Sequence, residues 1–224
     1  MSKGRVLSIQ SHVVSGYVGN KAAVFPLQLL GFDVDIANST HFSNHTGYAG
    51  GFEGDVLQGD QLRAILAGLE RNGLLRNIRH LLTGYIGSKT FLRSVLHVIK
   101  KLKDETGGRV RYVCDPVLGD NKRFYVPQEL VEVYKMEIIP LADVVTPNQF
   151  EVEALTGNAI KNVDDAIDAC KALHDMGPST AIITSIEFDS NPGKLAIFAS
   201  QRNKNKTEIW RIDSPFIEGR YTGK

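Results

Sequence analysis

The sequence alternates short apolar segments with longer amphipathic ones, and this alternation is the feature that most constrains the fold. Strand-like apolar segments are expected at residues 5–10, 33–39, 80–83, 110–114, 144–145 and 180–185. Helical spacing of apolar residues occurs between them, at residues 20–30, 60–72, 92–102, 127–139, 148–156 and 162–176. Strands separated by helices of this length are typical of βαβ units with a parallel sheet. We therefore expect an α/β fold, a three-layer α/β/α sandwich around a mainly parallel central sheet.

Local signals refine three of these elements. Pro26 falls inside the first expected helix, where a proline removes a hydrogen bond and clashes with the preceding turn. Asp60 is the expected N-cap of the second helix, because a short polar side chain can accept a backbone N–H there. Residues 40–59 are rich in Gly, Ser, Asn, Thr and His, which indicates a functional loop rather than core.

The chain is expected to end in a hairpin. Residues 194–200 and 208–213 are strand-like, and the polar stretch 201–207 between them is too short for a helix. Such a connection predicts an antiparallel pair at a sheet edge. No change in composition divides the chain, so we expect residues 1–224 to form a single domain.

Composition excludes several classes of protein. The 224 residues carry 26 basic and 25 acidic side chains, a net charge of +1, which argues against a nucleic-acid partner. No apolar run approaches the ~18 residues of a membrane span. Two cysteines, Cys114 and Cys170, cannot form a disulfide framework, and the first residues contain no signal-peptide pattern. We expect a cytoplasmic globular protein without a membrane contact, its cysteines being core thiols.

Polar side chains follow each expected strand directly. Because ligands bind at the carboxyl ends of strands in open parallel sheets, these positions are candidates for a binding site. The candidates are Ser11, Thr46, Tyr85, Asp115, Asp120, Thr146, Asn148, Glu151, Thr184 and Ser185.

Two pairs among them have both a chemical and a structural interpretation. Asp115 and Asp120 are suited to Mg²⁺, which takes one or two carboxylates together with phosphate oxygens and water. Either one could equally be a solvated carboxylate in a turn. Asn148 and Glu151 have the spacing of a capping box, which is a purely structural explanation. Alternatively they mark a nucleotide-phosphate and metal-water site beside a helix N-terminus.

The segments that carry these residues resemble a known family. In this order they read RVLSIQSHVVSGYVGN, FSNHTGY, LTGY, YVCDPVLGD, LADVVTPNQFE and IITS. This series is similar to that of the pyridoxal kinases, a family of the ribokinase-like superfamily, over essentially the whole chain. The related hydroxymethylpyrimidine kinases share the DP and TPN segments but have a different glycine-rich opening.

The resemblance implies ATP-dependent phosphorylation of the 5′-hydroxyl of pyridoxal, pyridoxine and pyridoxamine. It implies a typical homodimer that uses Mg²⁺ or another divalent cation, with K⁺ or Na⁺ as a monovalent activator. By motif, the implied vitamin contacts are Ser11, which would bind the pyridine ring, and Val18, Phe42, His45, Thr46 and Tyr85. The implied ATP contacts are Asp115, Tyr125, Asn148, Glu151, Thr184 and Ser185, and the implied cation-binding residues are Asp115, Asp120, Thr146 and Glu151.

The resemblance also implies a catalytic aspartate in a GTGD turn that begins at the position of Gly223. The sequence reads Gly223-Lys224 there and contains no GTGD. Sequence alone therefore predicts a domain incomplete at its C-terminus, without the helices that follow this turn, and a chain that is weak or inactive by itself. Two alternatives stay open: a non-catalytic B6-binding or dimerising isoform, and a hydroxymethylpyrimidine-type kinase.

Overall fold

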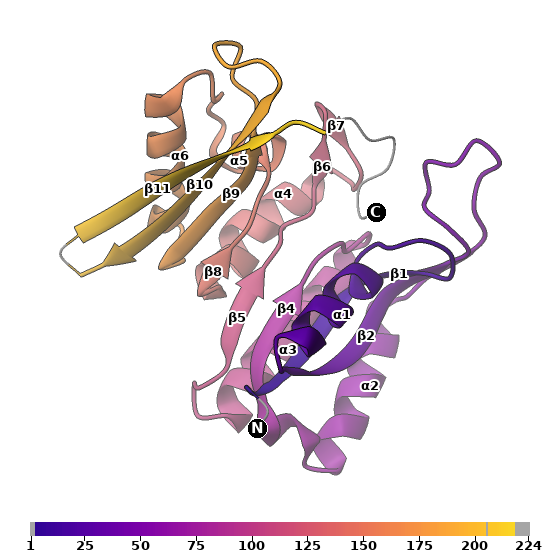
Figure 1. Ribbon diagram of the computed structural model, residues 1–224. Coiled ribbons are helices and arrows are strands. Elements are labelled where there is room, and N and C mark those ends of the chain that lie inside the picture. The colour runs from indigo at the N-terminus through magenta and orange to yellow at the C-terminus, as the bar shows by residue number, and fades with distance from the viewer. Residues whose placement is uncertain (1–2, 205, 218–224) are drawn as a thin grey trace. The chain divides into compact units, whose positions relative to one another are not determined.

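The computed structural model describes residues 3–204 and 206–217, which fall into two compact units. The first unit runs to Tyr112, and the second begins at Val113. Both are built from strands and helices (Figure 1). In each unit, neighbouring strands pair in parallel except toward one edge of the sheet, where the pairs are antiparallel. The expected α/β class with a mainly parallel sheet is therefore confirmed. The expectation that residues 1–224 form a single domain stays a prediction.

The sheet of the first unit is built around β1 (Arg5–Val13). β1 pairs in parallel with β2 (Asp33–Phe42) on one side and with β4 (Ile78–Thr83) on the other. The short strand β3 (Gly54–Val56) adds to β2 in antiparallel orientation. The carboxyl ends of β1, β2 and β4 consequently lie at one edge of the sheet, where sequence analysis expects the vitamin-binding residues.

Three helices connect these strands. They are α1 (Asn20–Leu29), α2 (Gly59–Arg71) and α3 (Lys89–Glu105), with a 3₁₀ turn, η1 (Leu74–Asn77), before β4. α1 packs on β1 and β2, and α2 packs against α3. The chain passes from β1 through α1 to β2 in one direction across the sheet, and it returns through α2 past β1 to β4 in the other direction. Right-handed crossovers in opposite directions place their helices on opposite faces of a sheet.

The second unit continues from β5 (Arg111–Cys114). Its strands follow the order β11-β10-β9-β8-β5, where β8 is Val144–Val145, β9 is Thr180–Ile186, β10 is Lys194–Asn203 and β11 is Lys206–Pro215. β8 is parallel to β5 and β9, whereas β10 and β11 are antiparallel. The predicted terminal hairpin is confirmed, with strands longer than expected.

Helices and a small ribbon complete the second unit. They are the ribbon of β6 (Gly119–Asp120) and β7 (Arg123–Phe124), α4 (Glu129–Val133), the π-helical turn η2 (Tyr134–Ile138), the 3₁₀ turn η3 (Ile139–Leu141), α5 (Gln149–Thr156) and α6 (Val163–Asp175). α5 and α6 pack against each other and on β9.

Three local predictions are wrong in detail. Residues 40–59 are not all loop, since β2 extends to Phe42 and pairs with β3. Asp60 is the second residue of α2 rather than its cap; the chain enters the helix at Gln58, whose N–H donates to the side chain of Gln61 at 2.7 Å. The continuous helix expected at 127–139 is broken into α4, η2 and η3, and the following Pro140 cannot donate the N–H that a regular helix would need.

Other local predictions are confirmed. α1 continues through Pro26, and α6 begins after Asn162, whose side chain accepts the N–H of Asp165 at 3.0 Å. The expected core thiols are confirmed: Cys114 and Cys170 are fully buried, and burial raises the pKa of Cys170 to about 11. In the part of the chain that the structure describes, no helix is both long and apolar enough to cross a membrane.

The close contact between α2 and α3 gives a test of this packing. A Cβ at Gly59 would lie 2.3 Å from the carbonyl oxygen of Thr90 and 2.5 Å from the hydroxyl of Ser94. We expect Gly59→Ala to lower the free energy of unfolding by about 1–3 kcal/mol, because the backbone of α3 must move. Gly68→Ala is the matched control, since Gly68 lies in the same helix with open space around it and should be neutral or stabilising by up to about 1 kcal/mol. Urea unfolding monitored by circular dichroism measures both, and equal midpoints for the two variants would contradict the prediction.

Candidate active site

The first unit brings Ser11 and Tyr85 to one edge of its sheet. Ser11 lies near the carboxyl end of β1, and Tyr85 follows the parallel neighbour β4. The two ends are joined by a hydrogen bond of 3.1 Å from the N–H of Gly84 to the carbonyl of Ile9. Burial raises the pKa of Tyr85, so its hydroxyl is protonated at neutral pH. Two hydroxyl groups are thus available at this edge as donors or acceptors.

A glycine turn after β1 holds Ser11 closely. Gly19 has a φ of +49°, and a Cβ at this position would lie 2.5 Å from the Ser11 hydroxyl and 2.2 Å from its carbonyl oxygen. No side chain fits there, so the glycine permits the chain to fold back over Ser11. Val18, the preceding residue, is half-buried in the same turn.

The remaining predicted vitamin contacts lie at the end of β2 and in the loop behind it. Phe42 is buried, and its ring centroid lies 4.7 Å from that of Phe52. His45 accepts the N–H of Gly47 through Nδ1 at 3.0 Å, and Thr46 is exposed. Over residues 3–204 and 206–217, no hydrogen bond joins Thr46 to Ser11 or Tyr85. The structure therefore brings Ser11 and Tyr85 together and leaves His45 and Thr46 in the loop.

In the second unit, Glu151 and Asn148 form a reciprocal pair at the start of α5. The Asn148 side chain accepts the N–H of Glu151 at 2.9 Å, and Glu151 Oε2 accepts the N–H of Asn148 at 2.8 Å. Glu151 Oε1 accepts the N–H of Leu118 at 3.0 Å, and Asn148 Nδ2 donates to the carbonyl of Gly119 at 2.8 Å. The capping box expected from the sequence is confirmed. It also fastens the segment after β5 to the start of α5.

Two carboxylates lie close together at this point. Burial raises the pKa of Glu151 to about 8; the N–H of Asn148 opposes this shift, and the negative charge of Asp115 adds to it. Burial raises the pKa of Asp115 to about 7. A cation would offset both the lost solvation and the mutual repulsion, since opposite charge favours the ionised form. The electrostatics of the second unit thus favour a positive ligand beside Asp115.

Asp120 and Tyr125 lie on the small β6–β7 ribbon. Asp120 Oδ1 accepts the N–H of Asn121 at 2.7 Å, and the turn runs through positive φ values at Asn121 and Lys122. Tyr125 is half-exposed, and burial raises its pKa, with further contributions from the charges of Asp120 and Glu151. These shifts place Tyr125 within electrostatic reach of both carboxylates.

The last predicted residues lie at the ends of β8 and β9. The N–H of Thr146 donates to the carbonyl of Cys114 at 3.0 Å, and the N–H of Thr184 donates to the carbonyl of Pro147 at 2.9 Å. Thr184 is exposed and Ser185 is half-buried. The ends of β5, β8 and β9 therefore meet, and they carry Asp115, Thr146 and Thr184 to one edge of the second unit.

The donor set fits a hard divalent cation. No group of three His, Cys, Asp or Glu side chains is arranged around a common point in the described ranges, so a cage made only of protein ligands is not formed there. Mg²⁺ needs no such cage, because it is usually held by one or two carboxylates together with phosphates and water. Asp115 and Asp120 supply such carboxylates, whereas both oxygens of Glu151 already accept backbone N–H groups.

Sequence analysis did not identify several buried or tightly packed residues that lie beside the candidate site and are not themselves candidate ligands. Asn20 is buried at the start of α1, and Ser39 is buried in β2. Gly119 has no room for a side chain, since a Cβ would lie 2.7 Å from the ring of Phe150. The sequence of β2 alone does not show that Ser39 is an extra residue. This becomes apparent only when β2 is aligned with its pairing partner β1. Gly223, where the resemblance implies that the turn with the catalytic aspartate begins, lies outside the described residues.

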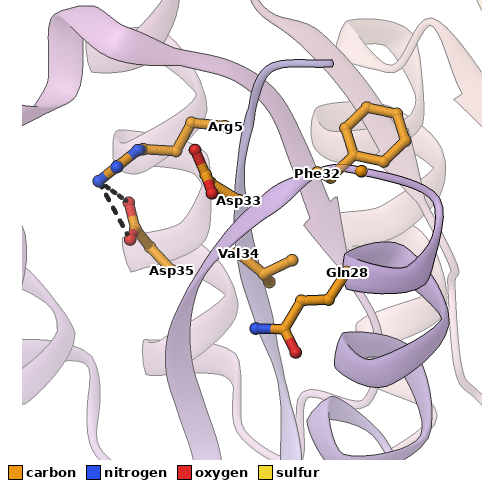
Figure 2. A pocket seen from close by; sticks show the side chains of 7 residues that line it. Arg5, Gln28, Phe32, Asp33, Val34 and Asp35 are labelled. Atoms are coloured by element: carbon orange, nitrogen blue, oxygen red, sulfur yellow. Dashed lines mark hydrogen bonds and ion pairs between the residues drawn. The ribbon is translucent and has the colours of Figure 1, made fainter. Parts of the chain in front are cut away.

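The first unit also has a cavity of about 650 Å³ that is separate from these residues. Figure 2 shows its lining side chains, including Arg5, Gln28 and Asp33, and the ion pair of 3.4 Å between Arg5 and Asp35. Arg5 and Asp33 begin β1 and β2, so the cavity lies at the amino ends of the strands. It is at the opposite end of β1 from Ser11 and is not part of the candidate site.

Comparison with known proteins places the chain in a family. Residues 64–220 match the family model described as phosphomethylpyrimidine kinase. The chain is 52% identical to the pyridoxal kinase of Arabidopsis thaliana over 222 residues, which cover 98% of this chain and 70% of that protein. The chain belongs to the pyridoxal kinase family.

Further relatives agree with this assignment. The pyridoxal kinase of Homo sapiens is 45% identical over 229 residues, which cover 95% of this chain and 72% of that protein. The pyridoxal kinase of Leishmania donovani, solved in complex with ADP and pyridoxamine, superposes with a TM-score of 0.93 at 39% identity. That match covers 98% of this chain and 77% of the solved one. The predicted membership of the ribokinase-like superfamily is confirmed.

The cap of α5 gives a second test. Asn148→Ala removes both the N-cap and the bond to Gly119, so we expect a loss of unfolding free energy of about 1–2 kcal/mol and faster amide exchange in residues 119–124. Asn162→Ala, the same cap on α6, should cost about 1 kcal/mol without changing exchange in the ribbon. Hydrogen exchange read by mass spectrometry distinguishes the two. Equal protection of the ribbon in both variants would show that Asn148 acts only as a helix cap.

Proposed function

We propose that this chain is a pyridoxal kinase, which transfers the γ-phosphate of ATP to the 5′-hydroxyl of pyridoxal, pyridoxine or pyridoxamine. One observation carries the proposal. The polar residues at the strand ends of both units lie in the segments by which the chain resembles this family, and relatives have been solved with ADP together with pyridoxamine or pyridoxine. The mainly parallel sheet supports this, since such sheets bind ligands at these strand ends.

The first unit supplies the proposed vitamin-binding residues. The Ser11 hydroxyl would hydrogen-bond the pyridine ring, and the Tyr85 side chain would line the pocket beside it. Val18, Phe42, His45 and Thr46 would complete the lining. The close approach of Gly19 to Ser11 supports this role, because it fixes the hydroxyl before any ligand arrives.

The second unit supplies the proposed nucleotide-binding residues. Asn148, Thr184, Ser185 and Tyr125 would contact ATP, while Asp115 and Asp120 would hold Mg²⁺ against its phosphates. Thr146 and Glu151 would help to place the divalent cation and a monovalent one, K⁺ or Na⁺. When bound, the divalent cation neutralises charge on the phosphates. The raised pKa of Asp115 supports this assignment, because burial removes solvation from that carboxyl and a bound cation would favour its ionised form.

A kinase assay tests the proposal. We expect purified chain with Mg²⁺ to bind pyridoxal and ADP, and we expect it to form the phosphorylated vitamin from pyridoxal and ATP. Binding is measured by calorimetry and turnover by formation of the phosphorylated vitamin. Binding of pyridoxal without turnover would indicate the non-catalytic isoform. Preference for hydroxymethylpyrimidine would indicate the related kinase instead, and absence of binding to either alcohol would contradict the proposal.

Ser11 allows a sharper test of the vitamin site. Ser11→Ala should weaken pyridoxal binding about five- to tenfold, because one hydrogen bond to the ring is lost. Ser15→Ala is the matched control, since Ser15 is exposed in the same turn and should leave binding unchanged. Calorimetric titration of both variants gives the comparison, and equal affinities would remove Ser11 from the site.

We also propose that the protein is a cytoplasmic homodimer that meets its second copy through the outward face of α1. This face carries Ala22, Phe25, Pro26 and Leu29, all exposed, with Phe25 at 65% and Leu29 at 70%. A helix whose outer and inner faces are both apolar is typically buried on both sides. Homodimer interfaces are more apolar than other surfaces, which supports a second copy as the partner.

Light scattering tests this surface. We expect a dimer for the unaltered chain and a monomer for Leu29→Glu, because a charge on the apolar face would be buried without a partner. Ile65→Glu on α2 is the control, since it also places a charge on a half-exposed apolar position and should leave the dimer intact. A monomeric unaltered chain, or dimers in both variants, would contradict the proposed surface.

A further inference from the structure

The strand β2 contains one residue more than its partner at the level of the vitamin site. Gln10 of β1 lies opposite Asn38, and the next residue, Ser11, lies opposite Thr40. Ser39 is therefore the extra residue of a β-bulge, and both Ser39 and Thr40 are buried. Bulges are frequent next to active sites, where they redirect a side chain. This one lies directly beside Ser11.

The side chain that the bulge redirects reaches across the sheet. The Ser39 hydroxyl donates to the carbonyl of Tyr85 at 2.6 Å. β1 lies between β2 and β4, so this bond joins β2 to the segment that follows a strand with which β2 does not pair. Ser39 is 1% exposed, and its hydrogen bond is therefore shielded from water. The bond ties the backbone of Tyr85 to the end of β2.

A buried network of hydrogen bonds around Asn20 of α1 lies next to the bulge. The amide of Asn20 donates to the side chain of Asn38 at 2.8 Å and to the carbonyls of Gln10 and Ala37 at 3.3 Å. The Ser8 hydroxyl donates to the side-chain oxygen of Asn20 at 2.8 Å. Asn20 thus joins β1 and β2 just before the extra residue, and hydrogen bonds hold the chain where it enters the bulge.

The segment that follows β4 is confined on its other sides as well. A Cβ at Gly84 would lie 2.6 Å from the side-chain oxygen of Gln10, and one at Gly87 would lie 3.0 Å from the hydroxyl of Tyr85. The segment therefore lies tightly on β1, and its own residue 87 lies under the tyrosine ring. With the backbone fixed by Ser39, the ring of Tyr85 has a defined position.

We propose that Ser39 is a positioning residue: through the backbone of Tyr85, it fixes the place of the Tyr85 side chain in the vitamin-binding half of the site. This rests on the proposed function, in which Tyr85 lines that half. Ser39 itself does not contact the substrate. Its effect is on the affinity for the pyridine compound and not on that for the nucleotide, whose proposed contacts all lie in the second unit.

The test compares Ser39→Ala with a matched buried serine. Ser94, also 1% exposed, accepts a hydrogen bond from Arg63 at 2.6 Å and donates to the carbonyl of Thr90 at 3.1 Å. Both alanine variants lose one buried hydroxyl and should lose similar stability. We expect only Ser39→Ala to weaken pyridoxal binding, about five- to tenfold, while ADP affinity stays within about twofold. We also expect faster amide exchange in residues 84–88 of this variant alone.

The outcomes separate the two hypotheses. Tyr85→Ala is measured in parallel, because it tests the proposed site directly. Loss of pyridoxal affinity in Tyr85→Ala but not in Ser39→Ala would overturn the positioning role and leave the proposed function in place. Equal losses in Ser39→Ala and Ser94→Ala would also overturn it, since they would reflect general destabilisation. Unchanged affinity in Tyr85→Ala would contradict the proposed site itself.

Discussion

The side-chain amide of Asn20 is buried between β1 and β2, where water cannot satisfy it. A buried polar group without partners costs several kcal/mol on alkane-like scales, about 1–3 kcal/mol in proteins, so its surroundings are arranged to supply them. Asn20 bonds to the side chains of Ser8 and Asn38 and to backbone carbonyls of both strands. These bonds join β1 to β2 immediately before the bulge, and Asn20 itself directly follows Gly19, whose turn lies against Ser11.

Glu151 has the corresponding place in the second unit. It is also buried at the start of a helix, and its oxygens accept backbone N–H groups from Asn148 and from Leu118. The two residues differ in that the Asn20 amide is always neutral, whereas the Glu151 carboxyl group can ionise. The amide therefore only fixes geometry. Burial and the charge of Asp115 both raise the pKa of the carboxyl group, and a nearby cation would favour its ionised form. The first unit is thus organised around a buried neutral side chain, and the second around a buried ionisable one.

The sequence predicts the structural features that depend on residues close to each other along the chain. The alternation of strands and helices, the cap at Asn162 and the pair Asn148–Glu151 are visible because the partners lie within four positions of each other. Contacts between distant segments are not visible in this way. Nothing local indicates that β2 extends to Phe42, that Ser39 bonds to Tyr85, or that Asp115 lies beside Glu151. Polar residues at strand ends were therefore predicted as a set, but their mutual geometry was not.

The extra residue in β2 gives this strand one position that can be lost without a change of face. Asn38 lies opposite Gln10 and Thr40 lies opposite Ser11, so Ser39 is the residue between them that has no partner in β1. Removal of Ser39 would leave each later residue of β2 opposite the same partner, and Phe42 would stay buried. Such a deletion would remove the bulge and the bond to Tyr85 but would keep the pairing of the sheet. The bulge can therefore be lost or gained while the strands around it keep their register.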